Sequence, residues 1–97
     1  MAAEKYDETY GKMELEDAEK EKAVSEIAQQ MKKSSLKRIR KLREKEGELW
    51  WKAYHYSYGL EVRKILRDAD FNWEEGTVDA FWPLLAEEAA EKVLGKK

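Results

Sequence analysis

Apolar residues recur at helical spacing along most of this chain. From Met13 onward they form a first stripe at intervals of three or four residues: Val24, Ile27, Ala28 and Met31. This period places them on one face of an amphipathic helix. Acidic residues crowd the beginning of the segment and Lys32 and Lys33 stand at its end, the charge order that the helix macrodipole favours.

The stripe shifts at Ser34 and Ser35. A continuation would fall near residue 35, but the next apolar residues are displaced by roughly 100° about the helix axis: Leu36, Ile39 and Leu42. Either one long helix turns its apolar face here, or a serine caps a new helix. We expect the long helix. Gly47 predicts a bend, because glycine costs ~1 kcal/mol inside a helix.

Residues 48–66 hold two of the four tryptophans, three of the five tyrosines and the single histidine. Each aromatic side chain can bury roughly 150–250 Å². Spacings of three or four predict a helix whose stripe contains Trp51, Tyr54, Tyr58, Val62, Ile65, Leu66 and Ala69. Trp50 and Tyr56 lie off this line, so several sides of the helix should be contacted. We interpret Gly59 as a point of close helix packing, with a functional kink as the alternative.

Turn signals follow this helix. We expect it to end near Asp68–Asp70, with an Asp in the left-handed conformation and Phe71 packing back on the helix. Oxygen-bearing side chains at positions 68, 70, 72 and 79 also match positions 1, 3, 5 and 12 of an EF-hand-like loop. Trp73 stands where that loop needs glycine. We therefore predict a helix end, a turn and a new helix, and no metal site, with calcium as the alternative.

The last helix has a clear stripe that Gly95 ends: Phe81 or Trp82, Leu85, Ala89 and Val93. Thr77 or Asp79 is expected to cap it. Pro83 complicates this assignment, because a residue without an N–H belongs in the first turn of a helix.

These elements predict an all-α fold of three or four helices. A long N-terminal helix would precede a compact helical C-terminal part centred on residues 48–94. Residues 1–12 are expected to be a flexible acidic arm, and residues 13–97 a single helical domain. A chain of 97 residues has a thin core for four tryptophans. We therefore expect a homo-oligomer.

Composition adds charge to this picture. Charged residues make up 41% of the chain, against a usual ~25%, and the net charge is −2. Cysteine is absent, and abundant Glu and Lys resemble a thermophile's composition. No apolar run is long enough to span a bilayer, so we expect a cytoplasmic protein with no membrane partner.

Residues 23–47 form a basic centre, with eight basic and three acidic side chains. A helix with an apolar seam on one side and cations on the other can lie along a nucleic-acid backbone. The candidate phosphate contacts are Lys33, Lys37, Arg38, Arg40, Lys41 and Arg43. The alternative is a solvated face balanced by acidic residues of a neighbouring helix or subunit.

Aromatic residues supply the second candidate group, which we expect to form core or a protein interface: Trp50, Trp51, Tyr54 and Tyr58. Base stacking is the alternative. His55 has no partner for catalysis in the sequence, there is no nucleophile motif, and there is no Gly-rich phosphate loop. We predict that the protein is not an enzyme and has no cofactor.

The nine residues Tyr58–Leu66 carry a resemblance. Their pattern of Tyr-Gly-Leu, an aliphatic residue, basic residues and Leu resembles the central helix of coat proteins from filamentous archaeal viruses. Those are small helical proteins that coat double-stranded DNA as oligomers. The resemblance implies an all-α chain that self-associates on DNA.

The sequence therefore predicts a non-enzymatic helical binding or assembly protein, with nucleic acid, in particular DNA, as its first expected ligand. The alternative is a structural or adaptor protein. It would self-associate or bind a protein partner through its long helix and its aromatic helix.

Overall fold

The computed structural model describes residues 16–95, and every regular element among them is a helix. Their order is α2 (Asp17–Gln30), α3 (Lys33–Glu46), the 3₁₀ segment η1 (Gly47–Tyr54), the π-helical turn η2 (His55–Gly59), α4 (Leu60–Asp68) and α5 (Glu75–Leu94). Within this part of the chain there is no strand, so the all-α prediction is confirmed. The predicted arm at residues 1–12 lies outside the described residues.

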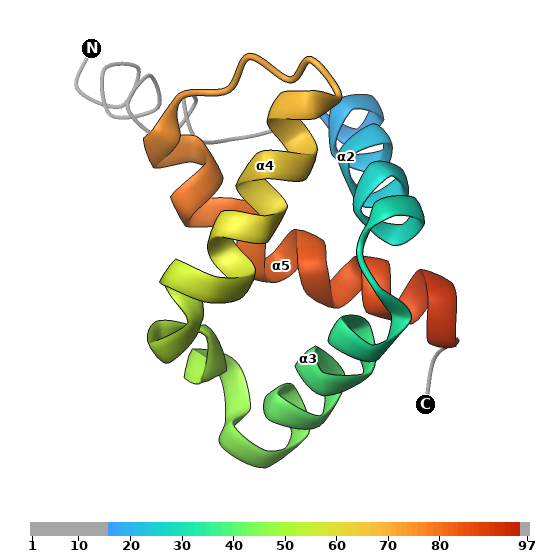
Figure 1. The fold of residues 1–97 in the computed structure, drawn as a ribbon, viewed down its shortest axis with the longest axis vertical. Coiled ribbons are helices and arrows are strands. Elements are labelled where there is room, and N and C mark those ends of the chain that lie inside the picture. Colours follow the sequence, from blue (N-terminus) through green and yellow to red (C-terminus); the bar gives the residue numbers. More distant parts are fainter. Residues whose placement is uncertain (1–15, 96–97) are drawn as a thin grey trace, which may run out of the picture.

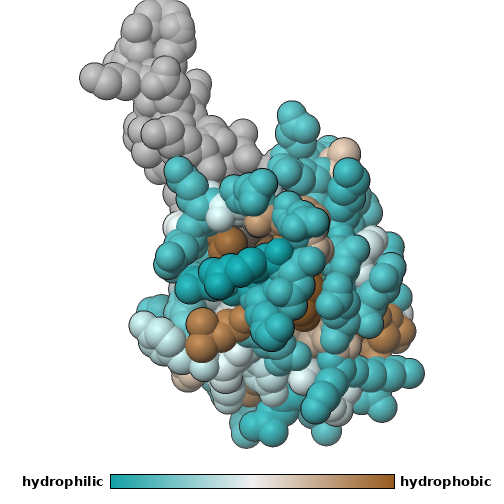
Figure 2. Space-filling model, turned by 45° about the horizontal axis from the view of Figure 1, so that its top comes forward, coloured by the Kyte–Doolittle hydropathy of each residue, from teal (hydrophilic) through white to brown (hydrophobic). Residues whose placement is uncertain are grey.

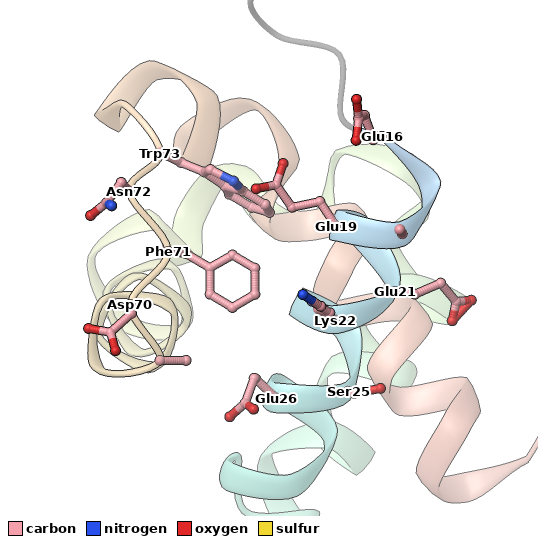
Figure 3. Close-up of a pocket in the computed structure, with 12 residues that line it drawn as sticks. Glu16, Glu19, Glu21, Lys22, Ser25, Glu26, Asp70, Phe71, Asn72 and Trp73 are labelled. Atoms are coloured by element: carbon pink, nitrogen blue, oxygen red, sulfur yellow. The ribbon is translucent and has the colours of Figure 1, made fainter.

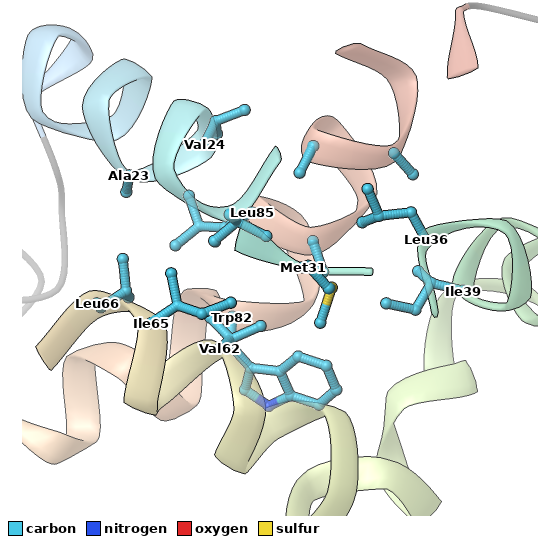
Figure 4. Close-up of a cluster of buried hydrophobic side chains, with 14 of the residues drawn as sticks. Ala23, Val24, Met31, Leu36, Ile39, Val62, Ile65, Leu66, Trp82 and Leu85 are labelled. Atoms are coloured by element: carbon cyan, nitrogen blue, oxygen red, sulfur yellow. The ribbon is translucent and has the colours of Figure 1, made fainter. Parts of the chain in front are cut away.

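Helix α5 is the element on which the others pack. It crosses the middle of the fold, with α2 and α3 along its C-terminal half and α4 across its N-terminal half (Figure 1). Trp82 and Leu85 of α5 are fully buried, and Ala86, Ala89 and Ala90 are at most 2% exposed. These alanines are short enough for two helices to approach the α5 backbone closely. Figure 4 shows side chains of α2, α3, α4 and α5 meeting in one hydrophobic cluster.

The predicted long N-terminal helix is wrong, because the chain breaks between α2 and α3. Met31 and Lys32 are extended, with ψ near 140°. Neither serine caps the new helix: its N-cap is Lys32, and no side-chain cap hydrogen bond is formed. The break has a packing cause. The two apolar stripes point about 100° apart on a continuous helix, and the turn lets both of them reach α5.

The aromatic stretch is helical, as predicted, but it is not one regular α-helix. Gly47 makes the expected bend at φ +83°. The chain then runs through 3₁₀ and π-helical turns before α4 begins at Leu60. A 3₁₀ turn holds about 3 residues and a π-helical turn more than 4, whereas an α-helical turn holds 3.6. Both kinds of turn therefore rotate the apolar stripe about the helix axis. The backbone is also non-helical at Leu49, with φ −101° and ψ 20°, and the next residue, Trp50, is buried at 1% exposed although it lies off the predicted line.

Gly59 packs against Trp82, which supports the packing interpretation. A Cβ on Gly59 would lie 3.1 Å from Trp82 Cε2 and 3.2 Å from its Nε1. The residue also closes the π-helical turn, so the helix is irregular where the indole approaches it. Close approach of the ring explains why glycine stands here.

The predicted end of α4 is confirmed in detail. Asp70 has φ +69°, the left-handed conformation. The amide of Phe71 donates to the Leu66 carbonyl at 2.9 Å, and that of Asp70 donates to the Arg67 carbonyl at 3.0 Å. This pair of bonds is the Schellman motif. Phe71 then packs against the core.

The predicted beginning of α5 is wrong. The N-cap is Glu74, so Thr77 already lies in the first turn and is 6% exposed. Pro83 lies inside the helix and is buried. An interior proline costs ~3 kcal/mol, and the burial of its ring helps to offset this cost. Gly95, at φ +84°, ends the helix as expected.

Candidate functional site

The orientation of α3 is fixed by its apolar seam. Leu36 and Ile39 are fully buried and Leu42 is 6% exposed. The opposite side of the helix faces outward and carries cations. Four lysines repeat every fourth residue, with an arginine beside them: Lys33, Lys37, Lys41, Lys45 and Arg38. We call these five exposed residues the basic face.

The lysines of the basic face follow one another at about 6 Å along the helix axis. None of the five cations forms an ion pair with a carboxylate of residues 16–95. Glu44 lies next to the row, which leaves the outer side of α3 with a net charge of +4. Each pair of like charges four residues apart destabilises a helix by about 0.2–0.5 kcal/mol. The row therefore destabilises α3 in isolation.

Two of the six predicted phosphate contacts point elsewhere. Arg40 donates to the backbone carbonyl of Gly95, and Arg43 Nε lies 3.3 Å from Glu87 Oε1. Both arginines follow a buried seam residue by four positions, so they flank the side that packs on α5. That spacing was visible in the sequence. The same spacing places Lys45, which was not among the six candidates, in line with Lys41.

Glu87 of α5 connects α3 with the aromatic segment. Its Oε1 pairs with Arg43, and its Oε2 accepts a hydrogen bond of 2.8 Å from Trp50 Nε1. The Arg43 side chain is 43% exposed, so solvent screens that ion pair. The Trp50 indole is 1% exposed, so its N–H has no access to water as an alternative acceptor. The hydrogen bond to Trp50 is therefore the more important contact.

We expect Glu87→Met to lower the free energy of unfolding by about 1–2 kcal/mol, because it leaves the buried Trp50 N–H without an acceptor. Glu87→Gln should cost less than about 1 kcal/mol, since an amide oxygen still accepts that bond. Urea unfolding followed by circular dichroism measures both variants. Equal losses would contradict the importance of the indole bond.

A second Glu on α5 holds α2. Lys20 Nζ lies 2.9 Å from Glu88 Oε2, and this hydrogen bond raises the pKa of the Lys20 ammonium. A raised folded-state pKa means that the pair stabilises the fold at neutral pH. The contribution is lost as the pH rises through that pKa.

The predicted aromatic group packs in and against the core, whereas the residues of the basic face are exposed. Trp50 meets Trp82 edge to face at 5.5 Å, and Tyr54 stacks on Tyr58 at 5.6 Å. Trp51, Tyr54 and Tyr58 are partly buried against the core. These rings contact one another and the core, which leaves fewer faces open to stack bases. Tyr56 is the exception among the aromatics of this segment, at 89% exposed.

His55 has a structural partner. Its Nδ1 accepts a hydrogen bond of 2.9 Å from Trp82 Nε1, and its ring lies edge to face with Trp51 at 5.1 Å. The accepting nitrogen must be unprotonated, which requires the neutral imidazole. The histidine therefore satisfies the indole N–H of a fully buried tryptophan.

The calcium alternative fails on geometry. Residues 68–79 do not form one loop between two helices, because Asp68 still belongs to α4 and α5 already begins at Glu75, the eighth of the twelve positions. Asp68 pairs with Lys64 at 3.0 Å, and Asp79 pairs with Arg63. Among residues 16–95, no three His, Cys, Asp or Glu side chains are grouped so that they could hold a metal ion.

Comparisons with known proteins provide no relative for this chain. No protein-family model matches the sequence, and searches of curated proteins and of solved structures find no similar chain. The resemblance to viral coat proteins rests on Tyr58–Leu66 alone. In the described part of the chain, no helix combines the length and the apolar character needed to cross a membrane.

Proposed function

We propose that this protein is a non-enzymatic nucleic-acid-binding protein that contacts phosphates through the basic face of α3. One observation carries the proposal. Five exposed cations line one side of a helix whose other side is buried, and none of them is paired with a carboxylate of residues 16–95.

The dimensions of the basic face suit a polyanion. The row from Lys33 to Lys45 is about 18 Å long. Duplex DNA carries one negative charge per ~1.7 Å of its axis, so several phosphates fall within reach. Binding would also remove the repulsion between lysines four residues apart. The contacts are to the backbone, so the proposed binding has little dependence on sequence.

The test is the fluorescence anisotropy of labelled duplex DNA, titrated with protein at several salt concentrations. We expect log K to fall linearly with log salt, with a slope of about −0.9 for each phosphate neutralised. Lys37→Gln/Lys41→Gln should reduce the magnitude of this slope by about 1.8 and weaken binding about tenfold or more at low salt. Labelled single-stranded DNA and RNA establish which nucleic acid is preferred.

Lys64→Gln/Arg67→Gln on α4 is the matched control, because it removes the same charge from another exposed surface. An equal loss of affinity in this control would show a response to net charge alone and would contradict the role of α3. Flat anisotropy of the unmodified protein at low salt would remove nucleic acid as a ligand. Charge reversal at Arg40 or Arg43 is a poor test, because both contact α5.

A second candidate function, protein binding or self-association, is favoured by a different surface. Tyr56, Leu60 and Leu84 are 89%, 45% and 41% exposed. They border two neighbouring grooves that share Trp51, Asp79 and Ala80 in their linings. Large exposed apolar side chains close together are typical of protein interfaces. Association through this surface would persist in high salt, whereas contacts of the basic face would not.

A further inference from the structure

A groove of about 1000 Å³ separates the N-terminal half of α2 from the segment that links α4 to α5. Figure 3 shows Phe71 and Trp73 projecting from this link toward α2, and Glu19, Lys22 and Glu26 projecting from α2 toward the link. The two rings meet edge to face at 5.1 Å. The groove thus combines aromatic surface with charged walls.

The charge of the groove is negative. One lysine and five carboxylates line it: Lys22, Glu16, Glu19, Glu21, Glu26 and Asp70. Of these, Glu19, Lys22 and Glu26 project from α2 toward the link, whereas Glu21 and Asp70 project away from it, so the groove itself carries a small negative charge (Figure 3). Glu19 makes no ion pair with any residue of 16–95, and Glu26 only accepts a hydrogen bond from Gln30 at 2.7 Å. Lys22 is the one cation of the lining, and none of the lining carboxylates forms an ion pair with a residue of 16–95.

We propose that the groove binds the basic face of α3 of a second copy of this chain. The two surfaces are opposite in charge, with the carboxylates of Glu19 and Glu26 in the groove and an excess of cations on the outer side of α3. Cations also suit the aromatic rings, because ammonium and guanidinium groups are attracted to the faces of Trp and Phe. The long aliphatic stems of lysine cover apolar surface while their charges reach carboxylates.

The position of the two surfaces determines the kind of assembly. The groove lies beside the beginning of α2, and the basic face lies on α3, beyond the chain break and toward the other end of the fold (Figure 1). Different patches on each copy therefore meet, so the contact is heterologous and propagates head to tail. The net charge of −2 is small, so overall repulsion opposes this association weakly.

The contact should be electrostatic. On the face drawn in Figure 2, polar side chains dominate and hydrophobic surface appears only in small, separate areas. The Debye length, beyond which salt screens the attraction between exposed charges, is ~3 Å in 1 M salt and ~10 Å in 0.1 M salt. Assemblies should therefore form at low salt and dissociate at high salt.

Head-to-tail association and nucleic-acid binding are then two uses of the same helix face, and each excludes the other on a given copy. This competition rests on the proposed function, but the docking of two copies does not. A DNA duplex that binds the basic face of α3 should therefore dissociate the head-to-tail assemblies into single copies.

Sedimentation velocity of the full chain tests the docking. At low salt we expect a mass that grows with concentration beyond the 11.5 kDa of one copy, and in about 1 M salt the mass of one copy. Glu19→Gln/Glu26→Gln and Lys37→Gln/Lys41→Gln should each abolish the growth. Their equimolar mixture should give a dimer and nothing larger, because one intact groove then meets one intact basic face.

Glu48→Gln/Glu91→Gln is the control, because it removes the same charge outside the groove and should assemble normally. A single-copy mass at low salt, a mixture that stays at single copies, or unchanged assembly in either double variant would overturn the docking. Duplex binding by Glu19→Gln/Glu26→Gln separates the two proposals. If this variant binds DNA but neither assembles alone nor pairs in the mixture, the function stands and the docking fails.

Discussion

Trp82→Ala should lower the free energy of unfolding by about 3–5 kcal/mol, the largest loss expected from any single substitution discussed for this protein. The side chain is fully buried at the crossing of α4 and α5. Its truncation removes the edge-to-face contacts with Trp50 at 5.5 Å and His55 at 5.6 Å. It also leaves His55 Nδ1 without its indole donor.

A domain of this size has about 5–15 kcal/mol of stability in total, so this variant should populate unfolded chain well below the ordinary melting range. Urea unfolding followed by far-ultraviolet circular dichroism measures the loss without depending on the deleted tryptophan. Trp73→Ala is the matched control. Its ring is only partly buried, beside Phe71 at the edge of the core, and it should cost clearly less. Similar losses in the two variants would contradict the central position of Trp82.

Gly59→Val should cost about 2–3 kcal/mol, because it forces side-chain atoms into the Trp82 indole. Even a lone Cβ would lie 3.1–3.4 Å from three atoms of that ring. The indole is enclosed by the core and held by His55, so it has little room to withdraw. β-Branching adds a smaller penalty within the helix.

Gly59→Ala separates crowding from helix propensity. Alanine is favoured over glycine in a helix by ~1 kcal/mol, so any net loss in this variant reports the contact with Trp82. Gly76→Ala is the control, because nothing lies within 4 Å of its added Cβ in the first turn of α5. Thermal unfolding should show Gly76→Ala equal to or above the unmodified protein and Gly59→Ala below it. The reverse order would mean that Trp82 can give way.

Local rules predicted the features that depend on neighbours in sequence. The left-handed residue after α4 is Asp70, and the next residue, the apolar Phe71, packs against the core. Gly95 ends α5 for the same kind of reason. Such caps are set by backbone sterics within a few residues, so no distant contact was needed to place them.

Only distant contacts decided which cations are free. Arg40 and Arg43 looked equivalent to Lys37 and Lys41 as charges in a run. The structure turns both arginines toward α5, where a carbonyl and the Glu87 carboxylate receive them. A run of charges does not identify the helix that will pack beside it. The four-residue spacing from the buried seam was the one available signal.

What the sequence determined by itself was the helical class, the two apolar stripes of the N-terminal half and the stops at Asp70 and Gly95, because periodicity and backbone sterics act locally. Tertiary structure decided the break at Met31–Lys32, the 3₁₀ and π turns that bury Trp50, and the early beginning of α5 before Pro83. In each case the conformation with poorer local geometry brings apolar surface into one core around α5. Burial of that surface outweighs the local cost, and no window of sequence contains the partner that receives it.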